Sequence, residues 1–284
     1  LTFHRCDGST WQKTTLAKGS SYSLPGVRDA EGYTFMGWST KPMQSVSPQY
    51  EAEEKITVNG NVDLYAVVFN RTTETDLTED QLPQVDIYKY KQVIFVGDSR
   101  TEFMENVLTG MGESATKNVK FVCSAGKGLD WFTTTGWAQL YSIVQHDSNS
   151  ILSKKTAVIF NFGVNDLSKS ADYAEYYNWI APQLKSKGCE LYFMSVNPVN
   201  RLMLPNAGRA DRSEAAVRSF NQYMKANLSS AYTYIDMYSY LKSTGYSFAS
   251  DHYGTGTVDD GLHYTTRTYK RIFAKCMDSL RVPA

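Results

Sequence analysis

From about Tyr88 onward, short apolar segments alternate with longer segments that have helical spacing. Five of the apolar segments have the length and composition of buried strands, at residues 92–96, 119–123, 157–162, 190–196 and 232–235. Strands that alternate with helices form a parallel sheet covered by helices on both faces. Because such crossovers are right-handed, all the strands end at the same edge of the sheet. This rhythm predicts an α/β fold.

The segments between the strands repeat their apolar residues with the period of a helix. In residues 172–187 and 213–228 these side chains fall on one face, and Ser213 is a suitable N-cap for the second segment. Residues 101–108 and 266–280 also have helical character. We expect helices in these ranges, packed on the two faces of the sheet.

The first 70 residues follow a different pattern. Short strand-like pieces lie at residues 1–3, 33–36, 55–58 and 63–69. Turn signals separate them, including Asp7-Gly8 and Pro25-Gly26. Residues 70–84 are polar and have no hydrophobic period, as in a linker or a strap across the next domain. We therefore predict a small β-rich module at 1–70, a linker at 71–87 and an α/β domain at 88–284.

The composition excludes several functions. Lys plus Arg and Asp plus Glu both number 29, so there is no basic excess for nucleic acid or a membrane surface. No apolar run approaches the roughly 20 residues of a spanning helix. No signal peptide is recognisable, and since the chain starts at Leu1 we expect a mature or excised form. The four cysteines show neither CxxC nor metal spacing, and we expect no metal. They are Cys6, Cys123, Cys189 and Cys276.

Four polar motifs fall where this topology places the carboxyl edge of the sheet. Three follow predicted strands and one precedes the last predicted helix. They are Gly97-Asp98-Ser99-Arg100, Ser124-Ala125-Gly126-Lys127-Gly128, Gly163-Val164-Asn165-Asp166 and Asp260-Gly261-Leu262-His263. Ligand sites of α/β proteins form at this edge, so we expect the motifs to build one site.

The residue types in these motifs suit acyl transfer, which needs a nucleophile, a base and a group that orients the base. Ser99 offers a hydroxyl, and His263 offers imidazole, whose ordinary pKa lies near neutrality. Asp260 stands three residues earlier and can fix the imidazole tautomer. The backbone N–H groups of Ser99 and Gly126, with the side-chain amide of Asn165, can bind the oxyanion.

The four motifs, in this order, resemble the blocks of the SGNH hydrolases, also called the GDSL-like lipase/acylhydrolase family. The resemblance covers about residues 88–284 and implies a three-layer, flavodoxin-like fold with a five-stranded parallel sheet. It also implies Ser99 as nucleophile, Asp260 and His263 as the rest of a triad, and Gly126 and Asn165 in the oxyanion hole. It implies no cofactor. The absence of a Gly-x-Ser-x-Gly elbow argues against the α/β-hydrolase solution to this chemistry.

The chain departs from the family pattern at two places. Arg100 replaces the commoner apolar residue after the serine, and the second block lacks the usual asparagine, which leaves Gly126 or Gly128 as the donor. We favour Gly126. Arg100 and Lys127 are candidate substrate-binding residues that would favour a polar or anionic substrate. The alternative for Arg100 is a pair with a carboxylate that shapes the loop.

A second resemblance covers residues 1–70. The segment from Gly32 to Thr40 (GYTFMGWST), followed by Val62 to Val67 (VDLYAV), resembles an internalin-type B-repeat, also called the Listeria–Bacteroides repeat. This resemblance implies a β-grasp-like fold and an exported bacterial surface protein. Phe35, Trp38 and Tyr65 are the expected core of the module.

Several residues near the motifs have simpler interpretations. His252 is a competing base without the Asp-x-x-His spacing, and Asp259 is out of register with Asp260. Asp98 and Asp166 are expected to bond loop backbone. We expect His4 and His146 to be exposed, and residues 200–212 to form either a lid beside the site or an ordinary surface loop.

The sequence thus predicts an extracellular or cell-surface serine esterase that removes short acyl groups, such as acetyl, from glycans. The expected partners are a small-molecule or glycan ester and a cell surface or polysaccharide, without nucleic acid or membrane insertion. One alternative is an acyltransferase that uses the same triad with a glycan hydroxyl as acceptor. Another is a surface adhesin whose hydrolase fold has lost activity.

Overall fold

The computed structural model describes residues 1–146, 154–204, 212–249 and 260–280. Its contacts divide the chain into two compact units. The first unit comprises Leu1–Thr75, Asn197–Val217 and Tyr238–Thr265, and the second comprises Asp76–Val196, Arg218–Met237 and Thr266–Ala284. The first unit therefore combines the N-terminal region with two segments from the C-terminal half of the chain. The domain boundaries at 70 and 88 stay a prediction.

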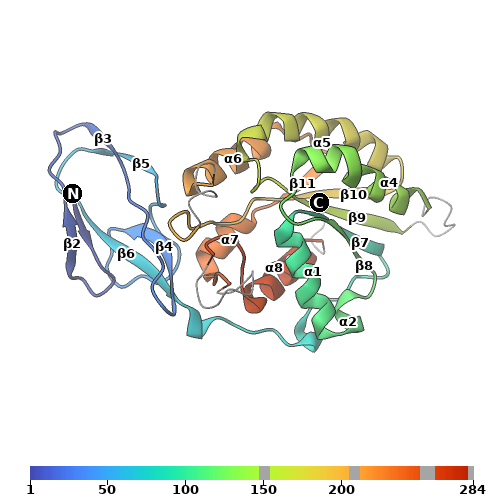
Figure 1. The fold of residues 1–284 in the computed structure, drawn as a ribbon, viewed down its shortest axis with the longest axis horizontal. Coiled ribbons are helices and arrows are strands. Elements are labelled where there is room, and N and C mark those ends of the chain that lie inside the picture. The colour runs from blue at the N-terminus through green and yellow to red at the C-terminus, as the bar shows by residue number, and fades with distance from the viewer. Residues whose placement is uncertain (147–153, 205–211, 250–259, 281–284) are drawn as a thin grey trace. The chain divides into compact units, whose positions relative to one another are not determined.

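The second unit is built on a five-stranded parallel sheet with the order β11-β10-β9-β7-β8 (Figure 1). The strands are β7 (Tyr90–Gly97), β8 (Val119–Cys123), β9 (Lys155–Asn161), β10 (Cys189–Met194) and β11 (Tyr232–Ile235). Numbered within the sheet, this order is 2-1-3-4-5, that of flavodoxin-like proteins. The predicted fold class and all five predicted strands are confirmed.

Helices cover both faces of this sheet. The helices of this unit are α1 (Ser99–Met111), α2 (Glu113–Thr116), α3 (Leu129–Trp131), α4 (Trp137–His146), α5 (Ser170–Lys185) and α8 (Thr266–Ser279). Two further helices, α6 (Glu214–Asn227) and α7 (Met237–Thr244), have residues in both units. Helices α4 and α5 lie over one face, and α1 and α8 over the other (Figure 1). Phe160 of β9 packs on Tyr177 of α5, with ring centroids 4.8 Å apart, and Phe95 of β7 packs on Phe273 of α8 at 5.8 Å. The predicted helices are confirmed, whereas α4 and α7 were not predicted.

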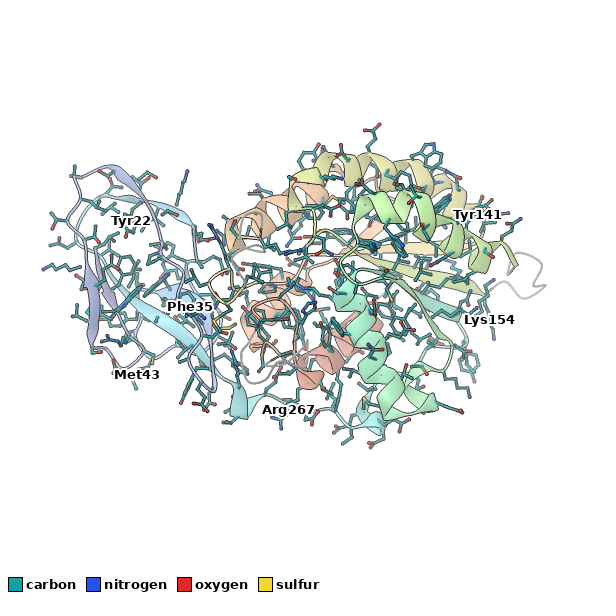
Figure 2. The ribbon with its side chains drawn as sticks, viewed as in Figure 1. Tyr22, Phe35, Met43, Tyr141, Lys154 and Arg267 are labelled. Carbon is teal, nitrogen blue, oxygen red and sulfur yellow. The ribbon has the colours of Figure 1, made fainter. Side chains whose placement is uncertain are left out.

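The N-terminal region is β-rich, as predicted. Its strands are β1 (Thr2–His4), β2 (Thr10–Lys13), β3 (Ser20–Ser23), β4 (Tyr33–Ser39), β5 (Lys55–Val58) and β6 (Asp63–Asn70). They form a four-stranded sheet, β2-β1-β6-β4, and a separate β3–β5 pair. Phe35 packs on the buried Trp38 in the core of this region, as expected. Met43, which follows β4, lies at the surface and is 86% exposed (Figure 2). Tyr65 instead stacks on His4, which is only 14% exposed, so the prediction of an exposed His4 is wrong.

Residues 71–87 carry two 3₁₀ turns, Arg71–Thr73 and Glu79–Gln81. Three side chains of this stretch are buried, at Glu74, Leu82 and Val85. The predicted linker is therefore anchored at these three residues, while most of its other residues are exposed. Among the described helices, none has the length and apolar character that crossing a bilayer requires.

Candidate active site

Ser99 is the first residue of α1, and only Asp98 separates it from the end of β7 at Gly97. Asp98 caps the helix, because its Oδ1 accepts a hydrogen bond from the backbone N–H of Arg100 at 3.0 Å. At Gly97 a β-carbon would lie 2.0 Å from Oγ1 of Thr101, so the turn can close this tightly only with glycine. The sequence thus places the Ser99 hydroxyl beside the positive end of a helix dipole. The expected structural role of Asp98 is confirmed.

The two glycines of the second motif have different surroundings. Gly126 has a φ of +69°, and among the described residues no atom lies within 4 Å of where its β-carbon would be. At Gly128 that β-carbon would lie 2.3 Å from Oδ2 of Asp166. Gly128 therefore serves close packing, while the backbone of Gly126 faces open space. Which of the two glycines donates to the oxyanion stays a prediction.

The third motif is tied to the second by hydrogen bonds. The Nδ2 group of Asn165 donates to the backbone oxygen of Lys127 at 2.8 Å. Asp166 accepts from the N–H of Leu129 at 2.9 Å and from the hydroxyl of Tyr173 at 2.7 Å. Burial raises the pKa of Asp166, and the two hydrogen bonds oppose that rise. Asp166 is a loop-holding residue, as expected, and it fixes the turn on which Asn165 stands.

Asp260 and His263 form a hydrogen-bonded pair. Nδ1 of His263 lies 2.5 Å from Oδ2 of Asp260, and the histidine side chain is 3% exposed. The other oxygen, Oδ1, accepts from the backbone N–H groups of Leu262 and His263 at 2.8 and 2.7 Å. Burial acts to raise the pKa of Asp260, but its bonds and charge interaction with His263 outweigh this and hold the pKa below its usual value. An ionised Asp260 therefore orients the imidazole, with Nδ1 as the donor.

Residues Phe248 and Ala249 pair with the chain on both sides of this turn. The N–H of Ala249 donates to the oxygen of His263 at 2.8 Å, and the N–H of Asp260 donates to the oxygen of Ala249 at 3.2 Å. Phe248 stacks on Tyr264 with ring centroids 5.5 Å apart. The aspartate and histidine are thus held by backbone bonds at both ends of the turn.

A family model described as GDSL-like lipase/acylhydrolase matches residues 93–276, which include all four motifs. The chain belongs to this family. It is therefore an ester-hydrolysing enzyme. A second model, the Listeria–Bacteroides repeat domain, matches residues 1–67 of the acylhydrolase. This repeat is a domain type of surface proteins. Both predicted resemblances are confirmed.

Solved structures of low sequence identity are similar to the acylhydrolase. A protein from Bacteroides fragilis assigned as an acylhydrolase is 16% identical, with a TM-score of 0.47 over 71% of this chain and 93% of that one. The catalytic domain of a peptidoglycan O-acetyltransferase from Streptococcus pneumoniae is 16% identical, at 0.40 over 67% and 92%. A catalytic mutant of an acetylxylan esterase from Geobacillus stearothermophilus is 11% identical, at 0.41 over 69% and 96%. No curated protein sequence matches the chain.

The predicted site residues of the acylhydrolase are divided between its two units. Ser99, Gly126 and Asn165 belong to the second unit, whereas Asp260 and His263 belong to the first. Their roles in catalysis stay predictions. Within the described residues, no group of three or more His, Cys, Asp or Glu side chains has the arrangement of a metal site.

The two candidate substrate-binding residues differ in exposure. Arg100 is only 2% exposed, which favours its alternative role in shaping the loop, whereas Lys127 is exposed. Contact of either residue with substrate stays a prediction. The competing base His252, the neighbouring Asp259 and residues 205–211 of the expected lid or surface loop lie outside the described residues.

Sequence reasoning did not find the role of Asn200, which we had placed in the lid or surface loop. Its backbone N–H donates to the oxygen of Gly261 at 2.8 Å, inside the Asp260–His263 turn. No local pattern signals this contact, because the two residues are far apart in the sequence. The requirement for glycine at position 261, where φ is +67°, is the one local indication of a crowded turn.

Proposed function

We propose that this acylhydrolase is an extracellular serine esterase that removes short acyl groups, above all acetyl, from glycans. The observation that carries the proposal is the Asp260–His263 pair, in which a partly buried carboxylate accepts a hydrogen bond from Nδ1 of the buried ring at 2.5 Å. This bond makes Nδ1 the donor and leaves Nε2 as an acceptor. A base with this tautomer is what a serine nucleophile requires.

In the proposed reaction, Nε2 of His263 takes the proton of the Ser99 hydroxyl while Oγ attacks the ester carbonyl. The oxyanion accepts hydrogen bonds from the N–H groups of Ser99 and Gly126 and from the amide of Asn165. The imidazolium returns its proton to the departing alcohol, which leaves an acyl-serine. Water then attacks this ester, gives a proton to His263, and the acid leaves as Ser99 regains its hydrogen.

Two observations support the substrate class. The family acts on esters, and the same chain carries a repeat of the surface-protein type. A protein held at a bacterial surface meets polysaccharides, whose acyl substituents are short esters. We infer the extracellular location from the same repeat.

The test is a hydrolysis panel of acetylated oligosaccharides, short aryl esters and long-chain lipid esters. Ser99→Ala should abolish turnover while the protein stays folded. Ser170→Ala is the matched control, since Ser170 is the first residue of α5 as Ser99 is of α1. Retained turnover in Ser99→Ala would refute the nucleophile, and preference for long-chain esters would refute the substrate class.

Two further measurements distinguish the alternatives. Product analysis with an acetyl donor and a sugar acceptor separates hydrolysis from transfer, because transfer yields a new sugar ester instead of acetate. A fluorophosphonate probe should label Ser99, and the labelling should vanish in His263→Ala. No labelling of the folded wild-type protein would exclude Ser99 as the nucleophile.

A further inference from the structure

The segment around Asn200 touches the turn that carries the proposed base. Besides the 2.8 Å bond from the N–H of Asn200 to the oxygen of Gly261, the hydroxyl of Tyr264 donates to the oxygen of Pro198 at 2.5 Å. A β-carbon at Gly261 would lie 2.3 Å from the backbone oxygen of Asn200. The segment therefore contacts the turn on either side of His263, through the backbone of Gly261 and through the side-chain hydroxyl of Tyr264.

The side chain of Asn200 reaches in the other direction, into the N-terminal module. Its Nδ2 group donates to Oδ1 of Asp29 at 2.7 Å and to the backbone oxygen of Val27 at 3.0 Å. Its Oδ1 accepts from the N–H of Leu202 at 3.2 Å. One residue thus links the module to the turn, with its side chain on one partner and its backbone on the other.

Asp29 is a rigid acceptor for this bond. Its side chain has no exposed surface, and it also accepts from the N–H of Phe35 at 3.0 Å and from Nη2 of Arg71 at 2.7 Å. Arg71 is held in turn by a 2.9 Å bond from its Nε to the hydroxyl of Thr34. Because β4 carries Thr34 and Phe35, the carboxylate is fixed to the sheet of the module.

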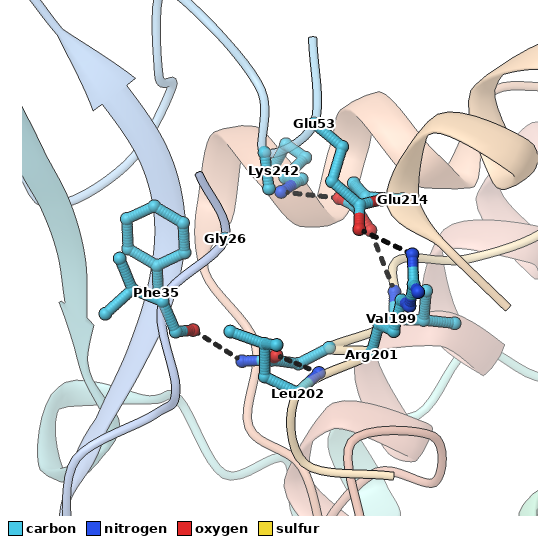
Figure 3. A pocket seen from close by; sticks show the side chains of 11 residues that line it. Gly26, Phe35, Glu53, Val199, Arg201, Leu202, Glu214 and Lys242 are labelled. Atoms are coloured by element: carbon cyan, nitrogen blue, oxygen red, sulfur yellow. Dashed lines mark hydrogen bonds and ion pairs between the residues drawn. The ribbon is translucent and has the colours of Figure 1, made fainter. Parts of the chain in front are cut away.

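The residue before Asn200 is anchored as well (Figure 3). The N–H of Val199 donates to Oε2 of Glu214 at 3.1 Å, and Oε1 of Glu214 pairs with Lys242 at 2.8 Å. The same ammonium group bonds the backbone oxygen of Met36 and the carboxylate of Glu51, both at 2.8 Å. Since Met36 and Glu51 belong to the module, this buried network joins it to the Asn200 segment a second time.

Glu74 of the N-terminal region contacts the chain on both sides of the Asp260–His263 turn. Oε2 of Glu74 accepts from the hydroxyl of Ser247 at 2.6 Å and lies 3.5 Å from that of Thr265. The backbones of Ser247 and Thr265 are bonded to each other at 3.0 Å. The two short segments that pair beside the Asp260–His263 turn, at Ser247 and Thr265, therefore both contact Glu74.

We propose that Asn200 is a positioning residue for His263, through which the N-terminal module sets the orientation of the base. The module then acts as part of the catalytic apparatus, in addition to any role at the cell surface. This inference rests on the proposed function, in which His263 is the base. Asn200 itself touches neither His263 nor Asp260 among the contacts described, and it acts through the backbone of Gly261.

The test compares Asn200→Ala and Asn200→Asp with Asn178→Ala in the full chain. Asn200→Asp keeps the size of the side chain but removes the Nδ2 donor that faces Asp29. Asn178 is the matched control because its amide also links two distant segments, with bonds to Asn227 and Ser229 at 2.9 and 2.8 Å. Both Asn200 variants should lose about tenfold in kcat with KM nearly unchanged. Asn200→Ala should be about as stable as the control, whereas Asn200→Asp should be less stable because it places a second carboxylate against the buried Asp29.

A second readout follows the histidine itself. The Nδ1–H resonance of His263 can be assigned among the four histidines by its loss in His263→Ala. In the Asn200 variants its exchange with water should rise at least tenfold, while Asn178→Ala leaves it unchanged. An unchanged resonance in both Asn200 variants overturns the positioning role, whatever the activity.

The two readouts also separate this proposal from the proposed function. Faster exchange together with unchanged kcat would mean that Asn200 orients His263 but that His263 is not the base. That outcome refutes the proposed mechanism and keeps the structural link. A loss of kcat with an unchanged resonance refutes the link, because the loss must then arise elsewhere.

Discussion

The backbone oxygen of Asn200 lies so close to Gly261 that a β-carbon on residue 261 would sit 2.3 Å from it. Gly261 also has a φ of +67°, which L-residues rarely adopt. We predict that Gly261→Ala destabilises the fold by about 3 kcal/mol or more, from backbone strain and steric clash together. Urea unfolding measures the loss, and kcat should fall with it because the Asp260–His263 turn must shift.

The control for this substitution is Gly188→Ala. Gly188 has a similar φ of +77°, but among the described residues no atom lies within 4 Å of the added β-carbon. The free energy of unfolding of Gly188→Ala should fall by only about 1 kcal/mol, from backbone strain alone, and its activity should be unchanged. Equal losses in the two variants would contradict the contact between Asn200 and Gly261.

Replacing Asp260 tests the orientation of the base. Asp260→Asn keeps the shape of the side chain but presents an amide to Nδ1 of His263, which favours the wrong tautomer. We expect kcat to fall roughly ten-thousand-fold with little change in stability. Asp130→Asn is the control, because Asp130 is 85% exposed and pairs only at the surface with Lys169. If kcat of Asp260→Asn falls by less than tenfold, Asp260 is not a member of the triad.

Removing the Asn165 amide tests the proposed oxyanion hole. Asn165→Ala should lower kcat by roughly 100- to 1,000-fold while KM changes little, since the donor acts on charge that develops in the transition state. Asn227→Ala is a suitable control, as its Nδ2 also donates to a backbone oxygen, that of Tyr223, at 2.9 Å. A change in KM alone would instead place Asn165 in ground-state binding.

Glu190 at the start of β10 should make stability depend on pH. Burial acts to raise its pKa, but bonds from Lys155 and Tyr90 outweigh this and lower the pKa from 4.5 to about 2. The ionised carboxylate therefore stabilises the fold above about pH 4.5, and this contribution disappears as the pH falls through 2. Denaturant unfolding from pH 7 to 2 should show wild type about 1 kcal/mol more stable than Glu190→Gln at pH 7. The difference should shrink in acid, and a constant difference would contradict the lowered pKa.

The strands of the parallel sheet could be predicted because each is a continuous apolar segment, as strands buried on both faces must be. Strands β2 and β3 were missed for the opposite reason. Residues Thr10–Lys13 are all exposed, and in Ser20–Ser23 alternate residues are only partly buried, so both segments become strands through pairing with β1 and β5. Helix α7 was missed because it is only eight residues long.

The Asp98 cap and the hydrogen-bonded Asp260–His263 pair could be predicted from the motifs, since turn, cap and Asp-x-x-His spacing are local properties. The supports of the site are not local. Asn200 and Asp29 are separated by 171 residues, and nothing in either neighbourhood specifies the bond between them. The composition of the first compact unit escaped prediction for the same reason, because contacts between distant segments define it.

A repeat that folds on its own can be removed, multiplied or fused to another enzyme without loss of contacts. The first compact unit of this chain opposes such exchange, since it includes Asn197–Val217 and Tyr238–Thr265 together with the repeat. A recombination event at residue 70 would separate Asp29 from Asn200 and Met36 from Lys242. The repeat and the hydrolase domain should therefore have evolved together, and a change in one partner of these contacts should be accompanied by a compensating change in the other.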